Sequence, residues 1–423
     1  MTESKLFLWG AATSSHQVEG NNRNNDWWAF EKAGRVRTCS ELACNQYELY
    51  RKDIEMIAKL GHNAHRFSIE WSRIEPEEGR WDESAFHHYE DMILEMRRFG
   101  IEPVVTLHHF TNPIWLAEKG GWLSPESPRY FKRYARKVAE VLGRHVTYWN
   151  TINEPVVYLF HGYCTGLWPP GKKTFPDAVK VFRHLLQGHV GAYEAMQQHY
   201  EEALGTRAMI SIAKHLSDFT PCNPLSVKDR WFTFLRDWFF NHLFLQALTN
   251  GFLFFPGLFC EFISSRSTLD YIGVNYYTRH FVRAGGDAPT PLGSDCNEKH
   301  HPGESKEINA MGWEVYPEGF YRILMSLKQY GLPVLVCENG ICAHEDEQRQ
   351  AFIKSHLGAL ERAGKDGLDV MGFFYWSLLD NFEWADGFKP RFGLVEVDYA
   401  TQARKVRQSA HVLAELCRNI KAF

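Results

Sequence analysis

Two glutamates stand where apolar, strand-forming segments of the chain come to an end. Glu338 follows the apolar run 333–337 and precedes Asn-Gly, a pair that turns a chain sharply. Glu154 ends a segment, 145–153, that is rich in β-forming residues, and Pro155 stops the strand there. Either glutamate alone could be half of a buried ion pair or a helix N-cap. Facing one cavity, the two could supply the acid and the nucleophile that cleave a glycosidic bond.

Other side chains suited to holding a substrate follow further predicted strands. Gln17 carries a donor and an acceptor on one planar head, which suits adjacent hydroxyl groups. Arg66 has a fixed charge, and near a carboxylate it would keep that group ionised. Because neighbours in a strand face opposite sides, a metal site built from both His108 and His109 is disfavoured, and we expect His109 to meet a hydroxyl and His108 to pack. Later strand ends hold Asn275, Tyr277 and Trp376.

These side chains can meet only if the strands that carry them share one end of a sheet. Strands are expected over residues 6–12, 63–71, 101–110, 145–155, 208–213, 269–277, 333–338 and 370–379. Apolar residues at helical spacing predict helices over 47–60, 86–99, 128–143, 182–200, 231–248, 317–331, 347–364 and 404–420. This alternation predicts one (β/α)8 TIM barrel over residues 1–423, with the site at the carboxyl ends of its strands.

Two stretches have a further expected character. The helix over 231–248 is rich in aromatic residues, which we expect to face the core. Residues 284–309 are rich in glycine, proline and charge, and predict a long surface loop.

Composition narrows the class of protein. The chain has 423 residues, of which 44% are hydrophobic and 23% charged, as in ordinary globular proteins. A net charge of −4 gives no reason to expect nucleic acid or an anionic membrane as partner. Aromatic residues reach 15%, with 14 tryptophans, and aromatic rings stack on the apolar faces of sugars as well as filling cores.

The cysteines and the amino terminus bear on location. The nine cysteines are odd in number and scattered, and no pair has zinc-ligand spacing. The sequence has neither a signal peptide nor an apolar run long enough to cross a bilayer. We therefore predict a cytoplasmic protein that needs no metal or organic cofactor. The oligomeric state is left open.

With these residues assembled, the sequence resembles the family 1 glycoside hydrolases, the β-glucosidase and β-galactosidase family. The resemblance runs from Phe7 to about Tyr399, and six motifs in the family's order carry it. They are SHQVEG at 15–20, RFSI at 66–69, TINEP at 151–155, NYY at 275–277, ENG at 338–340 and WSLLDNFEW at 376–384.

The resemblance implies a retaining double displacement with Glu154 as acid/base and Glu338 as nucleophile. Glu338 would stay anionic, while Glu154, in a less polar setting, would first be protonated and then act as a base on water. Support for the catalytic pair is implied for Arg66, Asn275 and Tyr277. Positions that bind the terminal sugar match Gln17, His109, Asn153, Trp376, Glu383, Trp384 and Phe392, with Asn153 at the 2-hydroxyl and Trp376 beneath the ring.

Two positions depart from the family pattern. Phe110 stands where the family usually has tryptophan, which removes an indole N–H donor. The loop 386–391 lacks the Ser-Lys-Tyr-like grip of members that bind 6-phosphorylated sugars. Lys389 and Arg391 could attract a phosphate, but Glu383 would repel one, so unphosphorylated sugars are favoured.

The expected activity is removal of terminal β-D-glucosyl units, and also galactosyl or fucosyl units, from small β-glycosides or oligosaccharides. A 6-phospho-β-glycosidase is the alternative enzyme, and transglycosylation is possible because a sugar hydroxyl can replace water. A catalytically silent sugar-binding barrel would be a protein of another class. Loss of a carboxylate would mark it, and both are present. The aglycone, the part of the substrate that leaves, depends on loops such as 168–171 and 284–309, whose sequence does not predict a preference.

Overall fold

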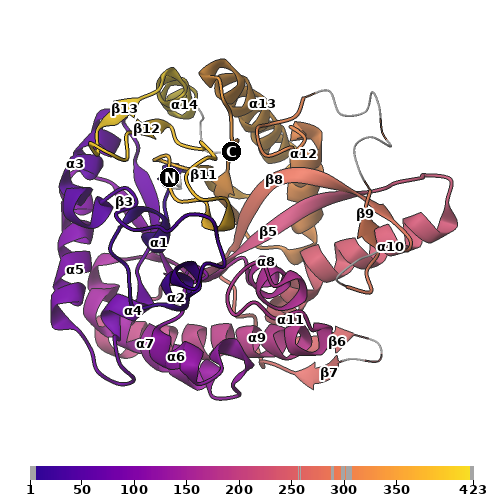
Figure 1. The fold of residues 1–423 in the computed structure, drawn as a ribbon, viewed down its shortest axis with the longest axis horizontal. Helices are drawn as coiled ribbons and strands as arrows, with labels where there is room; N and C mark the ends of the chain where they lie inside the picture. Colours follow the sequence, from indigo (N-terminus) through magenta and orange to yellow (C-terminus); the bar gives the residue numbers. More distant parts are fainter. Residues whose placement is uncertain are drawn as a thin grey trace.

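Strands that are all parallel to their neighbours close into a barrel (Figure 1). The structure is a computed structural model that describes residues 6–255, 257, 259–286, 290–296, 301 and 307–419. Around the ring the strands are β1 (Leu8–Ala12), β2 (Ala64–Ser68), β3 (Glu102–His108), β4 (Tyr148–Asn153), β5 (Met209–Pro221), β8 (Ile272–Arg283), β10 (Val334–Asn339) and β11 (Val370–Trp376). Because β11 pairs with β1, the ring is closed, and the predicted (β/α)8 barrel is confirmed.

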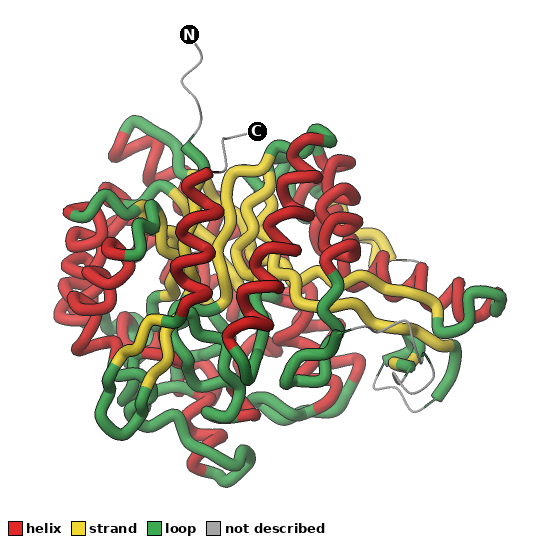
Figure 2. Tube along the Cα trace, turned by 90° about the horizontal axis from the view of Figure 1, so that it is seen from above, coloured by secondary structure: helices red, strands yellow, loops and turns green. Residues whose placement is uncertain are grey.

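Helices cover the outside of the strands (Figure 2). The longer ones are α3 (Gln46–Lys59), α5 (Glu83–Arg98), α7 (Ser127–Leu142), α9 (Phe175–His199), α10 (Val227–Asp237), α12 (Pro317–Ser326), α13 (Asp346–Lys365) and α14 (Gln408–Asn419). Shorter ones lie in the connections: α1 (Ser15–Val18), α2 (Asp26–Lys32), α4 (Trp71–Ile74), α6 (Ile114–Glu118), α8 (Pro155–Leu159) and α11 (Phe244–Asn250).

Local sequence explains where these helices begin and which face they bury. In α7, Phe131, Tyr134 and Val138 recur at helical spacing and are fully buried, while Lys132 is exposed. Helix α5 begins after Asp82, whose carboxylate accepts hydrogen bonds from the backbone N–H groups of residues 84 and 85 at 2.8 and 3.1 Å. The amphipathic pattern thus explains which face of α7 is buried, and the cap explains where α5 begins.

Every predicted strand and helix is present, but three segments differ from the expectation. Strands β5 and β8 run on beyond the barrel and stay paired as far as Pro221 and Val282, forming the arm at the right of Figure 1. The expected helix over 231–248 is divided into α10, a π-helical turn at 238–243 and α11. Trp231 and Phe234 are each 57% exposed, so the expectation that these aromatics face the core is wrong for them. Residues 404–406 form strand β13 (Arg404–Val406), paired with β12 (Val395–Val397).

The stretch 284–309 is only partly within the described residues, since 287–289, 297–300 and 302–306 lie outside them. It contains the short strand β9 (Ser294–Asp295), antiparallel to β8. Cys296, beside this strand, forms a disulfide with Cys222 at the end of β5, a pairing that a separation of 74 residues did not indicate. The other seven cysteines are free. Across the described residues, helices that combine the length and the apolar character needed to cross a membrane are absent.

Close packing between β5 and β8 yields a stability prediction. A Cβ at Gly273 would lie 2.3 Å from the carbonyl oxygen of Ile212 and 3.0 Å from Sγ of Cys337. Gly273→Ala should therefore lower the free energy of unfolding by about 1–3 kcal/mol, measured by denaturant titration. As a control, Gly358→Ala in α13 meets nothing within 4 Å and should raise it by about 0.5–1 kcal/mol. Equal stability of the two variants would contradict this account.

Candidate active site

The carboxyl ends of the barrel strands surround a cavity of about 1320 Å³. Most of the predicted site residues line it: His109, Asn153, Glu154, Tyr277, Glu338, Trp376, Glu383, Trp384 and Phe392. The other three predicted residues, Gln17, Arg66 and Asn275, are fully buried behind the cavity wall and contact residues that line it. His108, one residue before His109, points away and bonds Asn112, as the alternation of strand faces requires.

Glu338 lies at the end of β10, a strand that is buried throughout. Nη1 of Arg66 lies 2.5 Å from its Oε1, and the Tyr277 hydroxyl donates a hydrogen bond to its Oε2 at 2.6 Å. The side chains of Arg66 and Glu338 are only 1% and 4% exposed, so their charges meet with almost no water between them. A cation and a hydroxyl donor thus both favour the ionised form of Glu338.

Glu154 follows the end of β4 with a φ of 44°, in the left-handed region that is uncommon for a residue with a side chain. Its Oε1 accepts a hydrogen bond from Asn275 at 2.7 Å, and Nδ1 of His215 lies 3.2 Å from the same oxygen. Asn275 also donates to Asn153, which accepts from Arg66 at 2.7 Å. A continuous chain of hydrogen bonds therefore joins the two glutamates.

The pKa values of the two glutamates are displaced in opposite directions. Burial raises the pKa of Glu338 to about 7, with Arg66 opposing this rise and the charge of Glu154 adding to it. Burial also raises the pKa of Glu154, but His215 and Asn275 outweigh it, so the pKa lies below the usual value. In the enzyme without substrate, Glu154 and Glu338 together therefore hold one shared proton below about pH 7. The expected less polar setting of Glu154 is not found, because two polar side chains contact its carboxylate.

A second polar group lies after β11, where Gln17 holds Glu383 in place. The amide nitrogen of Gln17 donates to Asn381 at 3.1 Å, to the carbonyl oxygen of Phe382 at 2.9 Å and to Glu383 at 3.3 Å. Burial raises the pKa of Glu383 to about 8, and the charge of Asp386 adds to the rise. Glu383 is therefore mostly protonated at neutral pH and can both donate and accept hydrogen bonds.

Aromatic rings form the wall beside this polar group. The ring of Trp384 lies 4.7 Å from that of Trp27 and 5.2 Å from that of Phe110. The ring of His109 stacks 5.9 Å from Trp376 and 6.1 Å from Trp384. Flat apolar faces next to carboxyl, amide and imidazole groups suit a sugar, which has apolar C–H faces and a rim of hydroxyl groups.

Comparison with known proteins agrees with this geometry. Residues 2–422 match the model of glycosyl hydrolase family 1. The chain belongs to glycosyl hydrolase family 1. It is therefore a glycoside hydrolase of the β-glucosidase type, and the family that its sequence resembles is confirmed.

Three similar proteins illustrate the family. The structure of a β-glycosidase from Pyrococcus horikoshii is 44% identical, with a TM-score of 0.89 over 97% of this chain and 94% of that one. That of a β-glucosidase from Thermotoga maritima in complex with glucoimidazole is 32% identical, with a TM-score of 0.89 over 98% of each chain. A β-galactosidase from Pyrococcus woesei is 32% identical over 98% of this chain and 96% of its own length.

Potential metal ligands gather away from the lining of the family 1 cavity. Among the described residues, Cys222, Cys296 and His301 form a group whose ligand atoms lie within 4.8 Å of one another. The two sulfurs are bonded to each other as a disulfide, so neither is available as a thiolate. None of the three residues has a described contact with Glu154 or Glu338.

Sequence reasoning missed two residues next to Glu154. His215 lies in β5, beyond the expected end of that strand, and contacts Glu154 through Nδ1 and Ser217 through Nε2 at 3.1 Å. Lys214 is fully buried, and burial lowers its pKa to about 7. Its Nζ donates to the carbonyl oxygen of His215 at 2.6 Å. Both residues were missed because the strand was predicted to stop at 213. The extension of β5 beyond that point depends on its pairing with β8.

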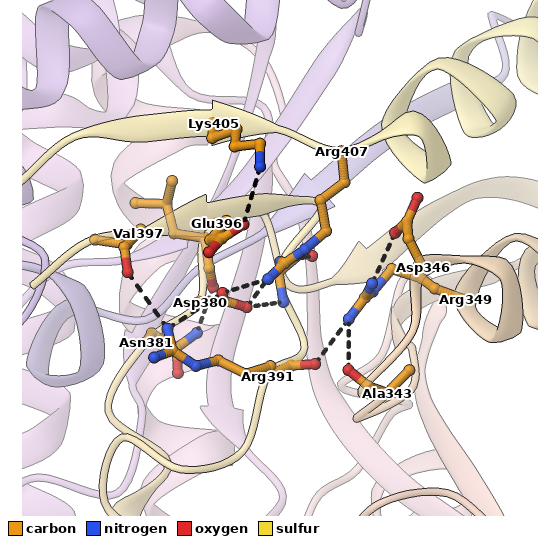
Figure 3. A network of polar contacts seen from close by, with 12 residues as sticks. Ala343, Asp346, Arg349, Asp380, Asn381, Arg391, Glu396, Val397, Lys405 and Arg407 are labelled. Carbon is orange, nitrogen blue, oxygen red and sulfur yellow. Dashed lines mark hydrogen bonds and ion pairs between the residues drawn. The ribbon is translucent and has the colours of Figure 1, made fainter.

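The segment that carries Glu383 and Trp384 is anchored by Asp380, which sequence reasoning also left out (Figure 3). The buried carboxylate of Asp380 accepts hydrogen bonds from Arg407 at 2.7 and 3.0 Å and from Arg391 at 3.3 Å. The backbone N–H of residue 393 adds a fourth at 2.9 Å. The segment that carries Glu383 and Trp384 is thus tied to the residues that flank the strand pair β12–β13.

Removing this anchor should affect both stability and binding. Asp380→Asn keeps the shape but leaves Arg407 without a counter-charge, so we expect a loss of about 3–5 kcal/mol of unfolding free energy and a raised KM for β-glucosides. Denaturant titration and steady-state kinetics measure the two effects. Glu396→Gln is the control, since Glu396 is 49% exposed, lies 4.0 Å from Lys405 and should change stability by less than about 1 kcal/mol. A stable Asp380→Asn enzyme with unchanged KM would refute the anchoring role.

Proposed function

We propose that this family 1 enzyme is a retaining exo-β-glycosidase that removes terminal non-reducing β-D-glucosyl units and also accepts galactosyl and fucosyl units. One observation carries the proposal. Two buried glutamates at the ends of β4 and β10 share a hydrogen-bond chain, yet only Glu338 is contacted by Arg66 and Tyr277. Such asymmetry suits one carboxylate that attacks and one that carries a proton.

In the first step, the ionised Glu338 attacks the anomeric carbon while the proton shared by the pair passes through Glu154 to the oxygen of the leaving group. A covalent glycosyl-enzyme forms, and the alcohol departs. In the second step, Glu154 takes a proton from water, whose oxygen attacks the same carbon and releases the sugar with its β configuration retained. Arg66 and Tyr277 then stabilise the carboxylate of Glu338 as it leaves.

The sugar would be bound by groups on the opposite side of the pair from the leaving group. Asn153, which accepts from Arg66 and donates toward His109 at 3.2 Å, is suited to the 2-hydroxyl. Trp376 supplies a face for the ring. The remaining hydroxyl groups are assigned to His109, Glu383 and Trp384 directly and to Gln17 through its hold on Glu383, while Phe392 contributes an apolar surface to the same pocket. Relatives described as a β-glucosidase and a β-galactosidase support tolerance at the 4-hydroxyl.

A 6-phospho-β-glycosidase is the second candidate because Lys389 lines the cavity. Its supposed partner Arg391 is engaged elsewhere, donating to Asp380 and to the carbonyl oxygen of Val397 at 3.3 Å. One lysine, with Asp386 in the same loop, is a poor match for a phosphate dianion. We therefore propose that the substrates are unphosphorylated sugars.

The domain organisation and the location also stay predictions: a single catalytic domain over residues 1–423, in the cytoplasm. The disulfide between Cys222 and Cys296 would be unusual in that compartment.

Kinetics with aryl glycosides test the proposal. The wild-type enzyme should hydrolyse nitrophenyl β-glucoside, β-galactoside and β-fucoside, but neither the α-glucoside nor the 6-phospho-β-glucoside. Glu338→Gln should lose at least about 10⁴-fold in kcat/KM on all substrates, because the nucleophile is gone. Glu154→Gln should lose about 10²–10⁴-fold on methyl β-glucoside and much less on a dinitrophenyl glucoside, whose leaving group needs no acid.

Proton NMR of the first product decides between retention and inversion, since the β-anomer of glucose should appear before the α-anomer. Release of α-glucose would refute the double displacement. Preference for the phosphorylated substrate would move the function to the second candidate. Sugar binding without turnover of any glycoside would favour the silent barrel.

The contact between His215 and Glu154 predicts a shift in the pH profile. Below about pH 7 the pair holds the proton that the first step consumes, so kcat/KM should fall as pH rises past that value. His215 lowers the pKa of Glu154, so His215→Asn should raise it and move the alkaline limb of the profile to higher pH. Lys214→Met is the comparison variant, because burial also lowers the pKa of Lys214 to about 7, while its Nζ bonds the carbonyl oxygen of His215 and not Glu154. If the alkaline limb of the pH profile moves only in Lys214→Met, then Lys214 and not His215 sets the position of that limb.

A further inference from the structure

One covalent bond ties a piece of the cavity wall to the arm formed by β5 and β8. Residues 290–296, which we call the wall segment, include β9, the strand that lies beside the arm in Figure 1. Three side chains of this segment line the cavity: Thr290, Leu292 and Asp295. Its last residue, Cys296, is bonded to Cys222, which directly follows β5. The disulfide therefore joins the lining of the cavity to the end of the arm.

The other described contacts of the wall segment are modest in strength. Strand β9 has two residues, and both pair with β8. Asp295 also meets Arg236 of α10 at 2.6 Å, but the aspartate side chain is 62% exposed, so this ion pair contributes little. The side chain of Leu292 is buried, and Ser294 accepts a hydrogen bond from Arg283 at 3.2 Å. Because segments with few buried contacts open locally at low cost, the disulfide is the strongest tie on this one.

The two cysteines differ in how far solvent can reach them. Cys222 is half-buried, while Cys296 is buried. An external thiolate can therefore approach Cys222 first, and exposed disulfides are more readily reduced than enclosed ones. In a reducing compartment, such as the cytoplasm predicted from the sequence, disulfides are rare and usually transient or redox-sensing. The position of this bond fits that class.

We propose that the disulfide between Cys222 and Cys296 is a redox latch. When it is closed, it holds the wall segment against the arm and completes the cavity. When a dithiol reductant opens it, that part of the wall loosens and substrate binding weakens. The inference goes beyond the proposed function, because it concerns how the cavity is held and not which bond is cleaved. Glu154 and Glu338, at the ends of β4 and β10, take no part in the latch.

The opening step is thiol–disulfide exchange. A thiolate of the reductant attacks Sγ of Cys222 to form a mixed disulfide, and the bond to Cys296 breaks, so that Cys296 leaves as a thiolate and takes up a proton. The second thiol of the reductant then attacks the mixed disulfide, releases Cys222 as a thiol and closes a disulfide within the reductant. Two electrons pass from the reductant to the protein, and a disulfide oxidant reverses the exchange.

The test begins with folded wild-type enzyme treated with dithiothreitol. When the treated protein is then denatured, a thiol reagent should count nine thiols in place of seven. If the open latch leaves the wall segment in place for about a tenth to a third of the time, KM for nitrophenyl β-glucoside should rise about three- to tenfold, with kcat changed less than about twofold. Reoxidation with glutathione disulfide should restore KM.

Hydrogen exchange supplies a readout that needs no substrate. The backbone N–H of Cys296 donates to the carbonyl oxygen of Phe281 at 2.8 Å, and it should exchange at least about tenfold faster in the reduced protein. Amides of β4 and β10 should exchange at the same rate in both states. Because no turnover is measured, failure of the proposed function would leave this result unaffected.

A matched set of variants assigns the effect to one bond. The double variant Cys222→Ser/Cys296→Ser should show the raised KM of the reduced enzyme and should not respond to dithiothreitol. Cys260→Ser is the control, since it removes an exposed free thiol on β7 (Phe259–Phe262) and should keep the full response. If the double variant folds poorly, the reduced wild-type protein still decides the question.

Three outcomes would contradict the inference. Nine thiols with unchanged KM and unchanged exchange at Cys296 would make the disulfide a purely structural bond. Seven thiols after treatment of the folded protein would mean that the bond does not open under native conditions. A response of equal size in the double serine variant would assign the effect to another cysteine.

Discussion

The site depends on a buried ion pair that has almost no contact with water. Arg66 and Glu338 lie side by side with almost no exposure, and such a pair is stable only if the remaining polar atoms of both partners are satisfied. Tyr277 and Asn153 meet most of that need, leaving Nε of Arg66 without a hydrogen-bond partner, and Asn275 links Asn153 to Glu154. Four strands contribute to this one network, so the barrel must close before the pair of carboxylates can exist.

The same closure brings polar and apolar groups to the wall of one cavity. The segment after β11 carries Glu383 and Trp384 and is tied down through Asp380 to Arg407. Apolar side chains of α8 and α9, among them Val156 and Phe182, line the same cavity.

Backbone geometry contributes to the site where side chains must be aimed. Glu154, Phe110 and Trp384 all have positive φ angles, at 44°, 73° and 48°, although none is glycine. Such conformations cost of order 1–3 kcal/mol each and persist only where surrounding contacts impose them. They occur at the exits of β3, β4 and β11, where the chain leaves the barrel and has to turn its side chains back toward the cavity.

Local patterns were sufficient for the barrel and for most of the residues around its mouth. Strand and helix periodicity depends on neighbouring residues, and a polar side chain at the end of a strand-forming segment is visible in the sequence, as at Glu154 and Glu338. What escaped prediction depends on distances between segments far apart in the chain. The extension of β5 along β8 brought His215 to Glu154, joined Cys222 to Cys296 and carried Trp231 away from the core.

The apolar lining of the cavity was equally hidden, because Phe182 and Phe239 look like ordinary core residues until the fold places them in the cavity wall. The identities of the proposed catalytic groups are thus a property of the sequence, since charge and hydrogen-bonding capacity belong to single residues. Their protonation, their partners and the shape of the space they face were decided by the tertiary structure, because burial and proximity arise only when the strands meet.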